Sequence, residues 1–202
     1  MSGARLAADD VRARLAARAP VHMQIPGFRR AAVLVPILQG PGGPELLLTV
    51  RSGRLRSHAG QIAFPGGRLE GGEDDVAAAI RETREEVGLV VGRDQVLGRL
   101  SDHPSPAGYV ATPVVALLDW SAPDELAPDP AEVAEAFTGP LAEWADVTPT
   151  SRVGQLQAYR RRIYSYLWRG RDIWGFTGNV VYDLLGALYG RGAVDGRDPF
   201  AP

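Results

Sequence analysis

The stretch of residues 67–89, GRLEGGEDDVAAAIRETREEVGL, constrains the fold of this chain most, because the sequence marks both ends of one helix in it. Two glycines permit a tight turn before the helix, and Asp74 and Asp75 place carboxylates where helix starts favour them. Gly88 is the residue type that most often follows a helix end. We therefore expect a helix over residues 74–87.

The expected helix has two different faces. At about 100° per residue, one stripe is apolar and carries Val76, Ile80, Thr83 and Val87. Glu82, Glu85 and Glu86 cluster on a face well away from this stripe. We therefore expect one side of the helix to pack in the core and the other side to be acidic.

The acidic face predicts a metal site. Three glutamates at i, i+3 and i+4 repel one another, and a merely solvated helix would more often alternate them with lysine. A hard divalent cation removes this repulsion, since Mg²⁺ prefers oxygen ligands, keeps several waters and bridges to substrate phosphates. Arg81, one turn before Glu85, can hold a carboxylate in its ligating orientation.

The pattern outside this stretch predicts a mixture of strands and helices. Helices are expected at residues 9–18 and 174–189, the second with Trp174 in the core and a buried stripe of Val181, Leu184, Leu185 and Leu188. Strands are expected at residues 31–38, 45–51, 61–64, 96–100, 109–118 and 159–168. Turns or loops are expected at residues 65–67, 102–108, 121–130 and 169–172, with a loosely held tail at 190–202.

Two details of this pattern bear on the sheet. The first two strands form a hairpin in which Pro36 favours an edge strand or a bulge. Residues 132–137 fit either a short helix or a strand. Because strands and helices alternate without a repeated βαβ rhythm, we expect a mixed sheet with helices packed on it.

Composition bounds the class of protein. The chain has 202 residues, 45% hydrophobic and 23% charged, and we expect residues 1–202 to form one domain around one core. The formal charge of −2 argues against a general nucleic-acid or anionic-membrane surface. Without cysteine, disulfides, a thiolate zinc site and a cysteine nucleophile are excluded. No secretory signal and no run of roughly 18 apolar residues occurs, so we expect a cytoplasmic protein.

The spacing of the helix stretch resembles the Nudix hydrolase box, Gx5Ex7REUxEExGU, in which U is a bulky aliphatic residue. The fixed single-residue positions are matched by Gly67, Glu73, Arg81, Glu82, Glu85, Glu86 and Gly88. Thr83 stands at a U position and is the one departure, although its methyl group still faces the apolar stripe. The resemblance implies an α/β fold, an α/β/α sandwich with a mixed central sheet.

The resemblance also implies a chemistry. A pyrophosphate bond would be hydrolysed with Mg²⁺ or Mn²⁺, held by Glu82, Glu85, Glu86 and the Gly67 carbonyl, with Glu82, Arg81 and Glu85 as the catalytic set. Either Glu82 or a carboxylate near Glu132 would help to deprotonate the attacking water. Glu132 and Glu135 follow the long loop, where related enzymes often supply an extra carboxylate.

Immediately upstream, residues 47–67, LLTVRSGRLRSHAGQIAFPGG, resemble the additional signature of the coenzyme A diphosphatase branch, LLTxR[SA]x3Rx3Gx3FPGG. This resemblance implies coenzyme A as the substrate, with 3′,5′-ADP and 4′-phosphopantetheine as products. Arg51, Arg56 and His58 lead into the metal helix and are candidates for binding the phosphates, which arginine can grip bidentately. Alternatively, the two arginines are exposed or paired with carboxylates, and His58 is a hydrogen-bonded histidine.

Two other functions share parts of this pattern. A hydrolase of ADP-ribose or of nucleoside diphosphate sugars would have the helix motif without the upstream signature. A non-catalytic nucleotide-binding regulator would have the same fold, but the intact glutamate cluster disfavours it. We expect a small-molecule substrate rather than a nucleic-acid or membrane partner, and a homodimer is compatible with the sequence.

Overall fold

A computed structural model describes residues 6–55, 58–120, 126–156 and 159–190. The helices are α1 (Ala8–Ala16), α2 (Asp75–Val87), α3 (Leu141–Asp146) and α4 (Gly175–Tyr189), with a 3₁₀ turn at Arg93–Gln95. The larger sheet contains β1 (Arg29–Gly40), β2 (Gly43–Arg51), β3 (Ile62–Ala63), β4 (Gly66–Arg68), β5 (Val96–Arg99), β6 (His103–Ser105), β7 (Tyr109–Asp119) and β8 (Val133–Pro140). A second sheet contains β9 (Thr150–Leu156), β10 (Tyr159–Trp168) and β11 (Arg171–Trp174).

The larger sheet is mixed, and β1 is a central strand in it. Strand β1 runs parallel to β7 along nearly its whole length. It is antiparallel to β4 near its start and to β2 near its end. Strands β5 and β6 pair antiparallel with β7, while β3 and β8 pair antiparallel with β2. Parallel and antiparallel pairs in one sheet confirm the mixed sheet expected from the sequence.

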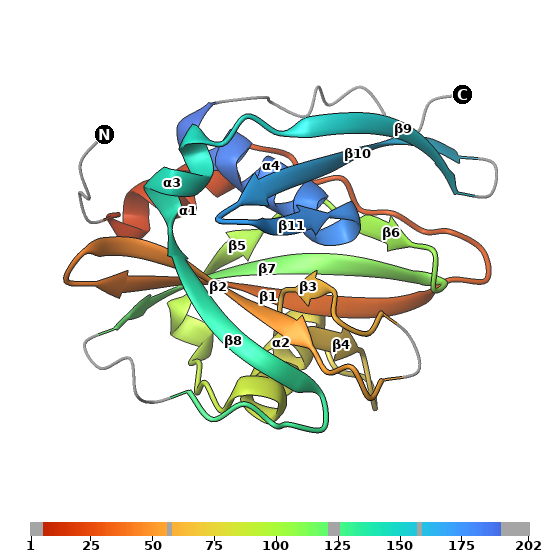
Figure 1. The fold of residues 1–202 in the computed structure, drawn as a ribbon, viewed down its shortest axis with the longest axis horizontal. Helices are drawn as coiled ribbons and strands as arrows, with labels where there is room; N and C mark the ends of the chain where they lie inside the picture. Colours follow the sequence, from red (N-terminus) through yellow and green to blue (C-terminus); the bar gives the residue numbers. More distant parts are fainter. Residues whose placement is uncertain (1–5, 56–57, 121–125, 157–158, 191–202) are drawn as a thin grey trace.

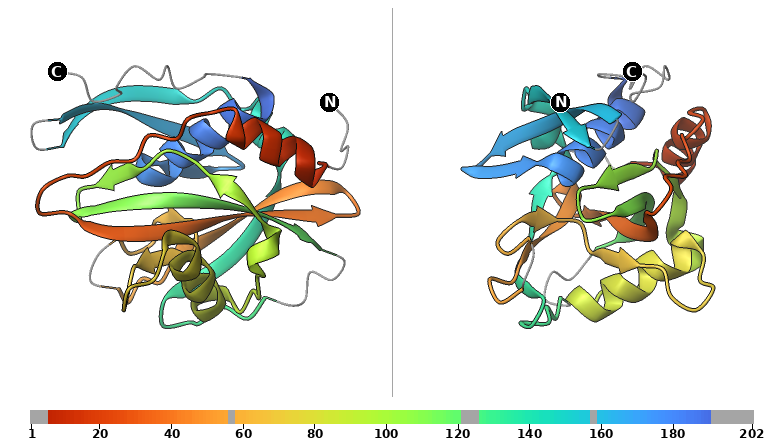
Figure 2. Two further views of the ribbon diagram at one scale, coloured as in Figure 1. Left: turned by 180° about the vertical axis from the view of Figure 1, so that it is seen from behind. Right: turned by 90° about the vertical axis from the view of Figure 1, so that its right-hand side faces the viewer.

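Helices cover both faces of this sheet. Helix α2 packs on one face, whereas α1, α3, α4 and the second sheet lie over the opposite face (Figure 1). The side view separates these layers and shows α1 beside α4 (Figure 2). Arg14 Nη1 donates to the Leu188 carbonyl at 2.8 Å, and Arg18 Nη2 contacts Asp183 Oδ1 at 2.7 Å, so the first and last helices are joined. The layered α/β/α architecture is therefore confirmed.

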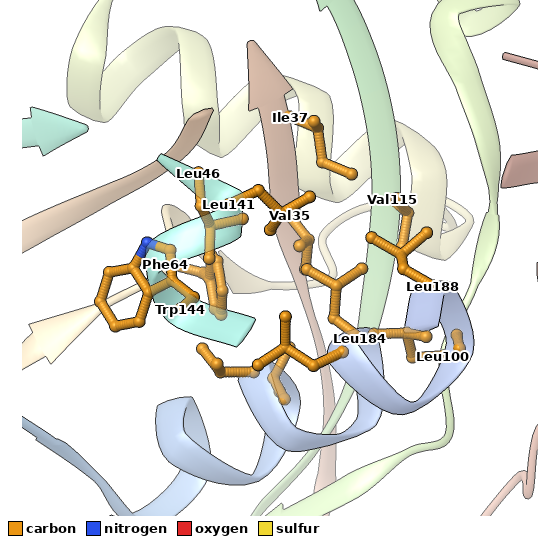
Figure 3. Close-up of a cluster of buried hydrophobic side chains, with 14 of the residues drawn as sticks. Val35, Ile37, Leu46, Phe64, Leu100, Val115, Leu141, Trp144, Leu184 and Leu188 are labelled. Carbon is orange, nitrogen blue, oxygen red and sulfur yellow. The ribbon is translucent and has the colours of Figure 1, made fainter. Parts of the chain in front are cut away.

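Two apolar clusters fill the two sides of the sheet. Because successive side chains of a strand point to opposite faces, Val35 of β1 packs in the cluster toward α4, while Leu34 packs in the cluster toward α2. The α4 cluster includes Trp144 of α3 and the expected stripe of the last helix (Figure 3). The stripe residues Val181, Leu184, Leu185 and Leu188 are all buried, as predicted.

Helix α2 has the two ends that the sequence marks. The Asp74 side chain caps its start by accepting a hydrogen bond from the Ala77 N–H at 2.7 Å. Gly88 ends it in the left-handed conformation at φ 73°. Val76, Thr83 and Val87 are buried as expected, and Ile80 is partly buried. One difference is that Glu86, assigned to the acidic face, is buried with these residues.

Pro36 lies in a central strand, so the expected edge position is wrong. Beside it, β1 pairs with β4 over residues 31–33 and with β2 over residues 37–40. In the interval between these partners, the Leu34 N–H donates to the Pro65 carbonyl. Because alternate backbone groups of a strand point the same way, the nitrogen of Pro36 faces this interval. Proline has no N–H to donate, and Pro36 lies where β1 changes from pairing with β4 to pairing with β2, so neither ladder loses a hydrogen bond there.

Several segments differ from the sequence-based expectations. The expected turn at residues 65–67 contributes to β4, the expected loop at 102–108 contains β6, and part of the expected turn at 169–172 belongs to β11. The undecided residues 132–137 lie almost entirely in strand β8. Helix α3 and strand β9 were not predicted. Strands β4 and β8 pair with β1 and β2, which are distant in sequence, a contact that local patterns do not report. Strands β6 and β11 pair with their sequence neighbours β7 and β10.

Trp174 is 44% exposed, so its expected core position is wrong. It precedes α4 and lies on β11, at an edge of the second sheet. Residues 121–125 of the expected loop and 191–202 of the expected tail lie outside the described residues. No helix within the described ranges is long and apolar enough to cross a membrane.

Candidate active site

Arg81 on α2 is the centre of a carboxylate cluster. Its Nε donates to Glu73 Oε1 at 2.8 Å and its Nη2 to Glu73 Oε2 at 3.1 Å. Its Nη1 donates to Glu82 Oε1 at 3.0 Å and to Glu85 Oε2 at 2.9 Å. The bonds from Arg81 lower the pKa of Glu73. One guanidinium thus fixes three carboxylates, which is the geometry that an orienting arginine needs.

The loop between β4 and α2 folds back onto Arg81. Gly71 and Gly72 turn the chain with φ of 53° and 85°, values that favour glycine. The Glu70 N–H then donates to Glu73 Oε2 at 3.1 Å, and Arg81 Nη2 donates to the Arg68 carbonyl at 3.1 Å. The loop is therefore held to the helix by both backbone and side-chain bonds.

Glu86 is a buried carboxylate at the edge of this cluster. It is 4% exposed, and its Oε2 accepts a hydrogen bond from the Gly66 N–H at 3.2 Å. Arg51 Nη1 lies 3.8 Å from its Oε1, which is an ion pair without a hydrogen bond. Burial raises the pKa of Glu86 to about 7, and the charges of Glu132 and Glu82 add to the rise. The hydrogen bond from Gly66 and the charge of Arg51 lower the pKa of Glu86 but do not offset its burial.

Glu82 lies against the backbone of Gly67. A Cβ at Gly67 would come within 2.4 Å of Glu82 Oε1, so only glycine leaves room for this carboxylate. Burial raises the pKa of Glu82 despite its bond to Arg81. Because Gly67 has no side chain, the Glu82 carboxylate can lie against the backbone of β4. The expected ligand set combines this carboxylate with the Gly67 carbonyl.

The structure separates the two carboxylates expected near residue 132. The Glu132 N–H donates to the Asp129 carbonyl at 3.0 Å, and its own carbonyl accepts from the Ser52 N–H at 2.8 Å. Glu132 is therefore held beside the cluster, close enough for its charge to raise the pKa values of both Glu82 and Glu86. Glu135 instead forms an ion pair with Arg171 at 2.7 Å, away from α2.

A divalent cation fits one part of the expected ligand set. Glu82 and Glu86 are desolvated, share raised pKa values and lie beside backbone that glycine leaves accessible. Glu85 differs, because its side chain is 59% exposed and contacts Arg81. Within the described residues no three acidic or histidine side chains converge as a ready-made metal site. The set of Glu82, Glu85, Glu86 and Gly67 therefore stays a prediction, with Glu82 and Glu86 the better-placed carboxylates.

Of the expected substrate-binding side chains, the structure describes Arg51 and His58, and Arg51 is the one that lies at the cluster. Arg51 ends β2 and contacts Glu86. His58 is exposed, has φ 59°, and its Nδ1 lies 2.8 Å from Gln61 Oε1. Arg56 lies outside the described residues. Between the two described candidates, Arg51 is therefore the one adjacent to α2.

Two further residues shape the cluster and were not among the expected site residues. Glu73 receives two bonds from Arg81, and its fixed place in the helix motif was the available signal. Gly66 has a φ of 153°, and its N–H donates to Glu86. A Cβ on Gly66 would come within 2.4 Å of the Ala32 carbonyl oxygen. No local pattern predicts so close an approach of β4 to β1.

The NUDIX domain family model matches residues 28–165, a span that includes β1, α2 and all the clustered side chains described above. The chain belongs to the Nudix hydrolase family. The Nudix fold implied by the helix motif is thereby confirmed. Nudix hydrolases are enzymes that cut pyrophosphate bonds of nucleoside diphosphate derivatives, and they generally use divalent cations such as Mg²⁺ or Mn²⁺.

Relatives of this Nudix chain carry the same family name. A protein of Photorhabdus laumondii named uncharacterized Nudix hydrolase NudL is 43% identical over 162 residues, covering 77% of this chain and 83% of the relative. A NudL of Escherichia fergusonii is 36% identical over 190 residues, covering 91% of this chain and 96% of the relative. The crystal structure of RenU, a Nudix hydrolase from M. smegmatis, is 26% identical, with a TM-score of 0.47 over 61% of this chain and 78% of that one.

Proposed function

We propose that this Nudix hydrolase cleaves coenzyme A, and its acyl derivatives, into 3′,5′-ADP and 4′-phosphopantetheine. The observation that carries the proposal is the position of Arg51. The upstream motif runs from β2 through β3 to β4 and thereby sets a cation beside Glu86. A diphosphate bound at the carboxylate cluster would meet this guanidinium, which can grip phosphate oxygens in pairs.

The residues of the chain divide the work of hydrolysis. Glu82 and Glu86 would hold the divalent cation, with the Gly67 carbonyl beside them, and Arg81 would keep Glu82 and Glu85 oriented. When bound, the cation neutralises phosphoryl charge and lowers the pKa of a coordinated water. Arg51 would bind the diphosphate, and Glu132 or Glu82 would accept the proton of the attacking water.

Glu132 is the better-placed proton acceptor of the two. Glu82 is already bonded to Arg81 and lies against Gly67, which suits a ligand. Glu132 is exposed and yet close enough to raise the pKa values of both buried glutamates. A general base needs access to solvent and nearness to the reacting water, and the exposed position of Glu132 beside the proposed metal ligands suits this role. A cytoplasmic location, a homodimer and the absence of nucleic-acid or membrane partners stay predictions.

The experiment is hydrolysis with product identification. The purified chain is incubated with coenzyme A and Mg²⁺ or Mn²⁺ in ¹⁸O-labelled water, and the products are identified by mass spectrometry. The proposal expects 3′,5′-ADP and 4′-phosphopantetheine, with the label on the phosphate of a single product. Chelation of the metal should stop the reaction. Intact coenzyme A after prolonged incubation with either metal would refute the proposal.

A further inference from the structure

Arg51 forms an ion pair with Glu86 that leaves its guanidinium incompletely hydrogen-bonded. The Nη1–Oε1 separation of 3.8 Å is too long for a hydrogen bond, although opposite charges attract at that distance. Arg51 Nε is buried and has no hydrogen-bond partner among the described residues. Buried donors in folded proteins are nearly always paired, so the guanidinium has capacity for a partner beyond those that the described part of the chain supplies.

The backbone at Arg51 is fixed while its side chain is not. The Arg51 N–H donates to the Gln61 carbonyl at 2.9 Å, and its carbonyl accepts from the Gly60 N–H at 3.0 Å. The pairing of β2 with β8 shifts register between Val50 and Arg51, which ends the regular ladder there. The side chain, 27% exposed, therefore extends from an anchored strand end into the region of the carboxylates.

We propose that Arg51 couples metal binding to diphosphate binding: its guanidinium neutralises Glu86 in the metal-free protein, and turns to the substrate diphosphate when a divalent cation takes Glu86. The proposal rests on the proposed function, because it requires a metal at Glu86 and a diphosphate beside it. Arg51 would then pair with Glu86 when no metal is bound and with the substrate diphosphate when the metal is bound.

Electrostatics requires such an exchange if both partners use Glu86. A divalent cation bound to the Glu86 carboxylate would lie next to a guanidinium, and two cations at that distance repel strongly. The metal therefore binds weakly, or Arg51 moves away. A diphosphate is a polyanion that arginine can grip through paired hydrogen bonds, and so it provides the new partner. By linkage, the metal and the diphosphate then strengthen each other's binding by the same factor.

The first test measures Mn²⁺ alone. Binding to the purified chain is followed by the electron paramagnetic resonance signal of free Mn²⁺ for the wild type, Arg51→Gln and Arg51→Met. Removing the competing cation should tighten the strongest Mn²⁺ site about tenfold in both variants. Structural damage would weaken the site, so the direction of the change distinguishes the two effects. Arg54→Gln, an exposed arginine of the same loop, is the matched control and should leave Mn²⁺ affinity unchanged.

The second test measures coupling with α,β-methylene-ADP, a diphosphate that is not hydrolysed at its bridged bond. Its dissociation constant is measured without metal and with saturating Mn²⁺. Saturating Mn²⁺ should raise the affinity for α,β-methylene-ADP about tenfold more in the wild type than in either Arg51 variant. The reason is that Mn²⁺ releases the Arg51 side chain from Glu86 only in the wild type. Thermal unfolding shows which variants are folded, and either folded neutral variant is sufficient.

Three results would overturn the coupling. They are unchanged or weaker Mn²⁺ affinity in a folded Arg51 variant, an equal gain in diphosphate affinity in wild type and variant, and no Mn²⁺ binding by the wild type. Coenzyme A hydrolysis by the wild type is judged separately. Tightened Mn²⁺ binding without coenzyme A cleavage would refute the substrate and keep the coupling. Cleavage with unchanged Mn²⁺ affinity would refute the coupling alone.

Discussion

The carboxylate of Glu82 lies against Gly67, so closely that a Cβ on Gly67 would come within 2.4 Å of Glu82 Oε1. The contact joins α2 to β4 at the place where a cation is proposed. It also makes a small substitution informative, because the atom displaced is the end of a flexible side chain rather than backbone.

We expect Gly67→Ala to lower kcat/KM by at least about tenfold while the free energy of unfolding changes by less than about 1 kcal/mol. The added methyl group would push Glu82 out of its proposed ligating position. Gly42→Ala is the control, since a Cβ there meets nothing within 4 Å. Steady-state kinetics and chemical denaturation of both variants provide the measurement. Full activity in Gly67→Ala would show that the position of Glu82 does not matter.

Replacing Glu82 or Glu86 by Gln should lower kcat about 100-fold or more, because each change would remove a proposed anionic ligand of the metal. Glu86→Gln should not destabilise the fold, since the charged carboxylate is disfavoured by burial and the amide has the same shape. Glu85→Gln should have a smaller effect, because Glu85 is exposed. Glu135→Gln is the control and should leave kcat unchanged, because Glu135 pairs with Arg171 of the second sheet, away from α2. Near wild-type rates for both Glu82→Gln and Glu86→Gln under saturating Mg²⁺ would refute the site.

If Glu132 accepts the proton of the attacking water, Glu132→Gln should lower kcat by about 10²-fold and leave Mn²⁺ affinity nearly unchanged. Loss of Mn²⁺ binding in this variant would instead assign Glu132 to the metal, and an unaltered kcat would leave Glu82 as the acceptor.

Stability should depend on pH through His103 on β6. His103 is buried, packs edge-on against Phe176, and its Nε2 has no hydrogen-bond partner within the described residues. Burial lowers its pKa, although the charges of Asp183 and Asp102 oppose this and Arg161 reinforces it. The unfolded chain therefore binds more protons than the folded chain below about pH 6.5, so the free energy of unfolding falls as pH falls through that value.

The check is denaturation of wild type and His103→Gln between pH 8 and pH 5. One proton contributes at most about 1.4 kcal/mol per pH unit to the slope of the free energy of unfolding against pH. This contribution should vanish in His103→Gln even if the overall stability of the variant is lower. Equal slopes in the two proteins would contradict the assignment.

The parts of the site that lie close together in sequence could be predicted. Asp74 and Gly88 fix the ends of α2 through local caps, and the spacing of Arg81 and Glu85 places both side chains on one face. The arrangement around Arg81 follows from helical geometry together with a short loop. Local physics was therefore sufficient to place the guanidinium among the carboxylates.

The parts that depend on distant chain segments could not be predicted. Glu132 lies beside the cluster because its carbonyl accepts from the Ser52 N–H, a pairing across 80 residues of sequence. The burial of Glu86 follows from the close approach of Gly66 to β1, which the helical periodicity of α2 does not contain. Trp174 is a large hydrophobic residue of the kind usually found in a core, but it lies on the edge strand β11. Its exposure therefore follows from the sheet topology and not from its hydrophobicity.

The most direct test of the coenzyme A assignment compares kcat/KM for coenzyme A, dephospho-coenzyme A and ADP-ribose under the same Mg²⁺ concentration. All three contain a diphosphate, so they differ only in the groups that a specific site must recognise. We predict the highest kcat/KM for coenzyme A, and a loss for dephospho-coenzyme A if a basic group binds the 3′-phosphate and is left unpaired. A much higher kcat/KM for ADP-ribose than for coenzyme A would contradict the assignment and make this chain an ADP-ribose hydrolase.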